Sequence, residues 1–180
     1  DGFGTFDVTI DNGKRQGVSK AYLNEIKGYK NLTIEHNTDV SKIIFKEKKA
    51  IGVEIKRNNH SQIYYCNKEV ILSSGSINSP KILQLSGIGD EKVLNKNGID
   101  IIHHLPGVGK NLQDHLEIYI QHKSKTKDTL YNLSTNYFTQ AIEWAKWFLL
   151  KKGMLTYSHL EVGGFVKTSE KYKHPNIQLH

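Results

Sequence analysis

The segment from Gly75 to Gly89, with the sequence GSINSPKILQLSGIG, holds the residues whose types and spacing are best suited to chemistry. The run Glu69 to Leu72 before it ends in Ser73-Ser74-Gly75, the pattern of a strand that is buried on both faces and turns into a helix. Backbone amides at the start of such a helix can receive an anionic or polar ligand at the carboxyl end of the strand. A single Gly or Ser is more often a plain turn residue, but that reading explains the whole run poorly. We therefore predict a ligand-binding turn here.

The helix in this segment has a marked start and end. Ser79 can accept hydrogen bonds from the exposed amides of the first turn, and Pro80 sits where a missing N–H costs little. Gly87 is the expected stop. The residues predicted to form its buried side are Ile82, Leu83 and Leu85.

A second glycine pair, Gly107 and Gly109, does not have the sequence of a phosphate-binding loop. The dinucleotide fingerprint needs a third Gly, and a nucleotide-triphosphate loop needs an upstream Gly and a Ser or Thr after Lys110. Leu105 to Gly109 instead predicts an irregular crossing between two packed units. We place a domain boundary in the composition shift between Leu105 and His115.

Residues 31 to 75 otherwise have the pattern of a small antiparallel meander. β-Branched residues alternate with polar ones in three runs, and polar tips separate the runs at hairpin spacing. The predicted strands are Thr33 to His36, Val40 to Phe45 and Ala50 to Lys56, with tips at Lys46 to Lys49 and Asn58 to Ser61.

A longer helix is predicted from Phe138 to Lys152, with Gly153 as its stop. The residues at helical spacing on its apolar side are Ala141, Trp144, Ala145, Phe148 and Leu149. Trp144 is therefore expected to be a core residue and not a ligand platform.

The net charge of +7 raises the question of nucleic-acid binding, but the distribution of the cations argues against it. Arg15 and Arg57 are the only arginines, whereas recognition of bases and phosphates favours the arginine fork. The lysines are scattered along the chain, and their diffuse field would help anionic ligands to approach.

Other classes of site and protein find little support in the sequence. Cys66 is the only cysteine, so an intrachain disulfide is impossible. His103 and His104 are expected in a strand or at its edge, and neither their spacing nor neighbouring carboxylates indicate a metal site. No apolar run approaches the roughly 18 residues of a membrane-spanning helix. We expect a cytoplasmic protein, either free or peripherally attached to a membrane.

The segment from Gly75 to Gly89 resembles, position by position, the second signature of the glucose-methanol-choline (GMC) oxidoreductase family. The resemblance extends over essentially the whole chain. Further matching stretches are Gly2 to Gly4, Gly17 to Leu23, Asn31 to Ile34, Ala50 to Glu54 and Leu105 to His115. The resemblance is closest to the choline-oxidising branch of the family, at Asp114 to Tyr119, Ser158 to Phe165 and Pro175 to His180. Asn136-Tyr137 departs from that branch, which usually has a Trp pair before its helix.

The resemblance implies an α/β (α+β) chain, with part of a Rossmann-like FAD-binding domain and a small antiparallel meander, followed by the start of a substrate-binding domain. Residues 1–30 would lead into the FAD domain, residues 31–115 would belong to it, and residues 116–180 would begin the substrate domain. FAD is the implied cofactor. The implied substrate is a small-molecule alcohol, first of all choline, oxidised to betaine aldehyde by hydride transfer to the flavin while a base takes the hydroxyl proton.

The resemblance also assigns roles to single residues. Val40 would hold the adenine end of FAD through its backbone, and Gly75 would lie near the nucleotide half. Glu117 would neutralise the trimethylammonium head of choline beside the aromatic face of Tyr137, because a quaternary ammonium has no hydrogen to donate. His180 would contact the substrate hydroxyl or alkoxide. Without the matches around them, Glu117 and His180 would be read as surface groups.

No catalytic residue is assigned within the chain. In the family the glycine-rich pyrophosphate loop lies upstream of this stretch and the main catalytic histidine lies downstream, so both ends of the chain are read as cuts. We therefore expect the chain alone to fold poorly, to retain no FAD and to oxidise no alcohol, because a strand ending at Leu72 would lack its neighbours.

Two other hypotheses stay open. Asn136-Tyr137 favours a family member that oxidises a different alcohol, and the net charge alone favours a basic, non-enzymatic binding module. The sequence determines neither the electron acceptor nor the oligomeric state.

Overall fold

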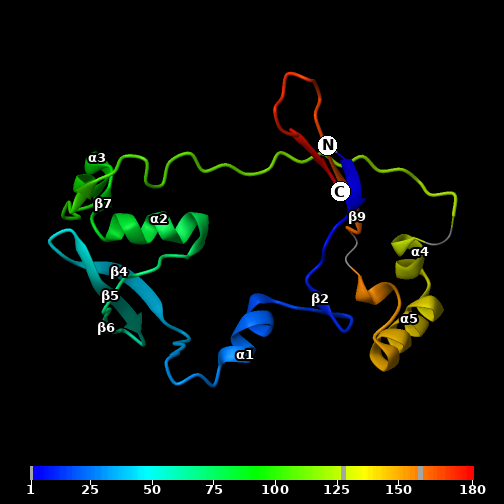
Figure 1. Ribbon diagram of the computed structural model, residues 1–180, viewed down its shortest axis with the longest axis horizontal. Coiled ribbons are helices and arrows are strands. Elements are labelled where there is room, and N and C mark those ends of the chain that lie inside the picture. Colours follow the sequence, from blue (N-terminus) through cyan, green and yellow to red (C-terminus); the bar gives the residue numbers. More distant parts are fainter. Residues whose placement is uncertain (1, 127–128, 158–159) are drawn as a thin grey trace. The chain divides into compact units, whose positions relative to one another are not determined.

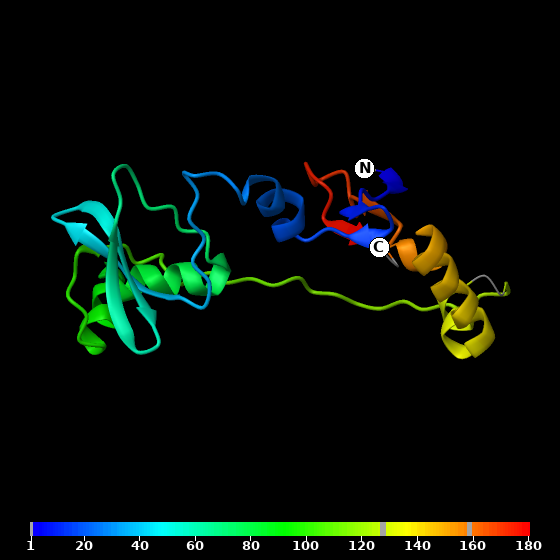
Figure 2. The same ribbon diagram turned by 90° about the horizontal axis from the view of Figure 1, so that it is seen from below.

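The computed structural model describes residues 2–126, 129–157 and 160–180, and its chain forms two compact units. One unit is Thr33–Tyr119, and the other combines Asp1–Leu32 with Ile120–His180. Figures 1 and 2 show the elements of each unit. Ser158 and His159, which belong to one of the matching stretches, lie outside the described residues.

The Thr33–Tyr119 unit is built on an antiparallel sheet with the strand order β4-β5-β6. The strands are β4 (Asp39–Lys46), β5 (Lys49–Arg57) and β6 (His60–Tyr65). Asn58 and Asn59 both have positive φ, which is the geometry that a two-residue hairpin turn requires. Two of the three predicted strands and both predicted tips are therefore confirmed.

Two predicted strands are wrong. Thr33 to His36 and Glu69 to Leu72 have no regular secondary structure, and Ile71 is 80% exposed. A strand needs a neighbour to accept and donate its ladder hydrogen bonds, and no described segment pairs with either run. An apolar β-branched sequence alone does not supply that neighbour.

Helix α2 (Gly75–Leu85) starts earlier than the sequence predicts. Pro80 lies inside the helix, and the Ser79 hydroxyl accepts a hydrogen bond from the Ser74 amide at 3.0 Å instead of capping the first turn. Gly87, with φ of 82°, follows the last turn as predicted. A proline in the helix removes one backbone hydrogen bond, which this helix tolerates within its second turn.

The core of this unit joins α2 to the sheet. Its buried apolar residues are Ile43, Ile55, Ile82 and Leu94. The buried Ser86 hydroxyl accepts from the Ile43 amide at 2.7 Å and donates to the Ile82 carbonyl at 2.5 Å. Leu85, which the helical pattern assigns to the buried side, is 42% exposed. After α2 the chain forms strand β7 (Ile88–Gly89), helix α3 (Glu91–Lys96) and strand β8 (His103–His104). The two strands pair in parallel.

The other unit contains an antiparallel sheet with the strand order β1-β9-β10. Its strands are β1 (Gly2–Thr5), β9 (Val162–Val166) and β10 (Ile177–Leu179). Gly163 and Gly164 lie under the rings of Phe6 and Phe3, which occupy the space that a side chain would need. The N-terminal stretch also forms the β2 (Ile10–Asp11) and β3 (Lys14–Arg15) hairpin and the helical turns η1 (Ser19–Leu23) and α1 (Asn24–Ile26).

The same unit carries α4 (Leu130–Thr135), α5 (Tyr137–Leu150) and the short helix η2 (Met154–Thr156). The predicted long helix is confirmed, with Gly153 after its end at φ of 96°. Its predicted buried face is wrong, because Trp144 is 58% exposed and the one residue of α5 described as buried is Glu143. The helix packs on η2 and the β2–β3 turn through the Glu143 and Trp147 side, and Trp147 donates its indole N–H to the Gly13 carbonyl at 2.7 Å.

Candidate cofactor and substrate site

The crossing segment from Leu105 to Gly109 is an irregular turn, as predicted, and two side chains tie it to the neighbouring helices. Gln84 on α2 donates its amide N–H to the Val108 carbonyl at 3.3 Å. The Lys110 ammonium donates to the Asp90 carboxylate at 3.0 Å. The turn is therefore anchored to the C-terminal half of α2 and to the start of α3.

Asp90 has a second task at the start of α3. Its other carboxylate oxygen accepts a hydrogen bond from the Lys92 amide at 3.0 Å, so it is the N-cap of that helix. The hydrogen bond from Lys110, followed by the one from the Lys92 amide, holds the pKa of the Asp90 carboxyl below its usual value. The Asp90 carboxyl therefore stays ionised to a lower pH than a free aspartate side chain does.

A cleft of ≈ 560 Å³ lies between α2 and the residues that follow the crossing turn. Its lining residues are Ser76, Ile77, Pro80, Lys81, Gln84, Gly109, Lys110, Asn111, Leu112 and Gln113. A Cβ atom at Gly109, where φ is 76°, would lie 3.0 Å from the Gln84 side-chain nitrogen. Two lysines and several amide groups make this cleft suited to a polar or anionic group.

The two residues assigned to the cofactor are both open to a ligand. Val40 lies near the start of β4, 39% exposed, beside an irregularity in the β4–β5 register between Val40 and Lys42. Gly75 begins α2 with φ of 84°, and no atom lies within 4 Å of the position that a Cβ would take. That left-handed φ favours glycine, and the bare backbone allows a close approach.

Glu117 lies on a stretch without regular secondary structure that runs through residues 111–120. Hydrogen bonding to Glu117, followed by the negative charge of that residue, raises the pKa of Tyr119 above its usual value.

Tyr137 and His180 belong to the other unit. Tyr137 is the first residue of α5 and is 87% exposed, after the N-cap Asn136 whose side chain accepts from the Phe138 and Thr139 amides. His180 directly follows β10. Since Glu117 lies in one unit and Tyr137 and His180 in the other, neither unit alone holds all three predicted substrate residues.

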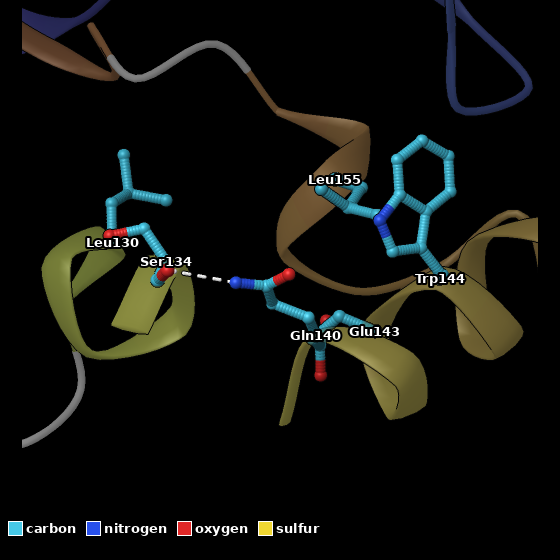
Figure 3. Close-up of a pocket in the computed structure, with 6 residues that line it drawn as sticks. All are labelled: Leu130, Ser134, Gln140, Glu143, Trp144 and Leu155. Atoms are coloured by element: carbon cyan, nitrogen blue, oxygen red, sulfur yellow. Dashed lines mark hydrogen bonds between the residues drawn. The ribbon is translucent and has the colours of Figure 1, made fainter. Parts of the chain in front are cut away.

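A pocket of ≈ 360 Å³ lies among α4, α5 and η2. Figure 3 shows the residues that line it, which are Leu130, Ser134, Gln140, Glu143, Trp144 and Leu155. The Gln140 side chain closes one side by donating to the Ser134 carbonyl at 2.8 Å. Sequence reasoning proposed no ligand for any of these six residues, and the lining of the pocket is largely apolar.

Glu143 is the charged residue of this pocket, but its contacts serve the fold. One carboxylate oxygen accepts from the Lys146 ammonium at 2.6 Å, and the other accepts from the Met154 amide at 2.8 Å. The Lys146 hydrogen bond, followed by that from Met154, lowers the pKa of Glu143. A lone acid among the apolar residues of α5 was the signal in the sequence, and its role is to close the turn after the helix.

Comparison with known proteins decides the family. A family model described as GMC oxidoreductase matches residues 1–117. The chain belongs to the GMC oxidoreductase family. The predicted family and the predicted mixed helix and strand fold with small antiparallel sheets are thereby confirmed.

Two curated relatives of this GMC oxidoreductase chain match all of it. The mitochondrial choline dehydrogenase of Homo sapiens is 45% identical over 182 residues, which cover 100% of this chain and 30% of the relative. The oxygen-dependent choline dehydrogenase of Photobacterium profundum is 42% identical over 180 residues, covering 100% and 32%. The chain thus spans about a third of the length of these relatives.

Solved structures agree with the family. An FAD-dependent oxidoreductase from Chaetomium thermophilum superposes with a TM-score of 0.84 at 34% identity, over 91% of this chain and 30% of that one. A formate oxidase gives a TM-score of 0.72 at 26% identity, over 87% and 27%. Family membership favours an oxidoreductase over a basic, non-enzymatic binding module.

Two further observations concern the described residues alone. They contain no helix that is long and apolar enough to cross a membrane. Nor do they hold a group of three or more His, Cys, Asp or Glu side chains placed for a metal ion.

Proposed function

We propose that this chain is part of an FAD-dependent alcohol oxidoreductase that oxidises choline to betaine aldehyde. The observation that carries the proposal is the identity of 45% and 42%, over the whole chain, to two proteins named as choline dehydrogenases. A cytoplasmic location, free or peripherally attached to a membrane, stays a prediction from the sequence.

The residues present fit FAD at the surface where Val40 and Gly75 are assigned. Gly75 offers a bare backbone with open space at its Cβ position, and the exposed start of α2 offers backbone amides to a negative group. The irregular register beside Val40 frees backbone groups of β4 for hydrogen bonds to a ring such as adenine. When bound, FAD would supply the acceptor for a hydride from the alcohol carbon.

The substrate part of the proposal rests on three side chains. Glu117 would attract the positive head of choline by charge, and the exposed ring of Tyr137 would supply an aromatic face. The imidazole of His180 would hydrogen-bond the substrate oxygen and orient it. The proton of that hydroxyl would pass to a base, for which this chain offers no assigned residue.

The substitution Glu117→Gln in the full-length protein tests this assignment. Losing the carboxylate should raise KM for choline about 10- to 100-fold, because a charge that pairs in a closed site contributes about 2 kcal/mol or more. The matched substrate is the isosteric alcohol with carbon in place of the ammonium nitrogen, whose KM should not change. Equal effects on both substrates, or none on choline, would overturn the assignment of Glu117.

A second candidate is oxidation of a different alcohol by the same family chemistry. Asn136 and Tyr137 favour it, because the choline-oxidising branch has a Trp pair where this chain has these residues. Under this alternative the wild-type protein should turn over an uncharged primary alcohol with a higher kcat/KM than choline.

A further inference from the structure

We propose that Asn136 is a positioning residue for Tyr137, because its side chain caps helix α5 and thereby fixes the direction in which the Tyr137 side chain leaves the backbone. This inference rests on the proposed function, in which the exposed ring of Tyr137 offers an aromatic face to a quaternary ammonium. It gives Asn136, which in the sequence marks only a departure from the choline-oxidising branch, a task in substrate binding.

The side chain of Asn136 reaches past Tyr137 and binds the backbone beyond it. Its amide oxygen accepts hydrogen bonds from the Phe138 amide at 3.0 Å and from the Thr139 amide at 3.1 Å. N–H groups in the first turn of an α-helix have no acceptor within the helix, so a capping side chain supplies one. Asn136 itself is extended, with φ of −117° and ψ of 106°, which is the usual backbone of an N-cap. The chain therefore changes from extended to helical at Tyr137.

Both peptide groups that flank Tyr137 are held by hydrogen bonds. Before it, the Asn136 carbonyl accepts from the Gln140 amide at 2.9 Å. After it, the Phe138 amide donates to the Asn136 side chain. Because a peptide group is planar, holding the groups before and after a residue fixes its φ and ψ, and with them the direction of its Cα–Cβ bond. The Tyr137 ring is left with rotation about its own side-chain bonds.

A second side chain ties the start of α5 to the end of α4. Gln140 donates its amide N–H to the Ser134 carbonyl at 2.8 Å, a bond that Figure 3 shows. Helix α4 ends at Thr135 and α5 begins at Tyr137, so Asn136 alone connects the two helices. Asn136 is thus both the connection and the cap, and the first turn of α5 is held against α4.

Positioning matters because Tyr137 is 87% exposed, so that packing restrains its ring little. An aromatic face attracts a quaternary ammonium only when the cation lies over the ring, within about 6 Å of its centre. If the first turn of α5 frayed, the substrate would bind well only to the fraction of molecules in which the turn is ordered. The cap raises that fraction before the substrate arrives and so lowers the entropy lost on binding.

The test is steady-state kinetics of the full-length flavin-loaded protein with Asn136→Ala, which removes both cap bonds. KM for choline should rise about two- to fivefold, as expected when a cap is lost and the first turn frays, while kcat stays within about twofold. Asn136→Ser restores a neutral capping oxygen and should keep the wild-type KM. Thr129→Ala, which removes the side-chain cap of the neighbouring helix α4, is the matched control and should leave KM unchanged. A rise of KM in either of these two variants as large as in Asn136→Ala would overturn the inference.

A double variant separates positioning of the ring from a general effect on the fold. Tyr137→Leu, which removes the ring, should raise KM for choline, and adding Asn136→Ala to it should raise KM no further. A KM that is unchanged in Asn136→Ala but raised in Tyr137→Leu would overturn the inference and leave the proposed function standing. An unchanged KM in Tyr137→Leu would overturn both the inference and the assignment of Tyr137. Loss of flavin in Asn136→Ala, or an equal rise of KM with and without the ring, would show a structural role and also overturn the inference.

Discussion

At the scale of single residues, the buried carboxylate of Glu143 shows how a charge can stabilise the fold without taking part in chemistry. Its two oxygens hold Lys146 and the Met154 amide, so that the chain turns directly after α5. Gly153 belongs to the same arrangement, because a side chain there would collide with the Glu143 carboxylate. The position of the one acidic residue of α5 is therefore explained by its contacts.

This arrangement predicts a pH dependence of stability. The folded state lowers the pKa of Glu143 below 4.5, so its stabilising contribution is present above that value and is lost as the pH falls through the lower, folded-state pKa. Thermal unfolding of the full-length protein should show Glu143→Gln to be less stable at neutral pH, with the difference shrinking in acid. The exposed Glu170→Gln is the control. A difference that stays constant from neutral to acid pH would contradict this role.

The functional residues show what a sequence can and cannot supply at this scale. Glu117, Tyr137 and His180 were assigned by resemblance to the family, and their roles stay predictions. The influence of Glu117 on the pKa of Tyr119 depends on how close the two side chains lie, which residue types alone do not encode.

At the scale of elements, strands β4 and β5 and helix α5 were predicted because their patterns are local. The alternation of β-branched residues and the turn residues between them determine the hairpin. The start of α2 was wrong because Ser79 and Pro80 have the composition of a helix start, whereas the helix continues back to Gly75. The run to Leu72 was wrong because a strand depends on a neighbour that its own sequence does not contain.

Two glycines that follow helices, Gly87 after α2 and Gly98 after α3, give a prediction about stability. Gly87 and Gly98 both have positive φ, but only at Gly87 would a Cβ collide, with the Asp100 carbonyl. Gly98→Ala should cost about 1 kcal/mol through backbone strain alone, and Gly87→Ala about 3 kcal/mol through strain and collision. Chemical unfolding of the two variants measures the difference. Equal losses of stability would mean that the close approach at Gly87 is not as the structure has it.

At the scale of the whole molecule, the chain leaves much apolar surface uncovered. Among the many exposed large apolar side chains are Ile71, Ile77, Leu112, Leu116, Ile118, Phe148 and Leu149. Exposed apolar side chains in such number are typical of surfaces that other protein segments cover. It agrees with a chain that spans about a third of the length of its relatives.

This surface predicts how the chain behaves when it is produced alone. It should associate or precipitate and should bind no FAD, because the cleft and the open backbone at Gly75 would form only part of a cofactor site. Size-exclusion chromatography with an absorbance spectrum tests both statements, with the full-length protein as the control. A monomeric, yellow preparation of the 180-residue chain would contradict the prediction.

The most direct test of the central claim is an anaerobic titration of the full-length purified protein with choline, followed by its visible spectrum. The account predicts a yellow protein whose flavin bands bleach in proportion to the choline added, as betaine aldehyde appears. A colourless protein, or flavin that stays oxidised with choline in excess, would contradict it.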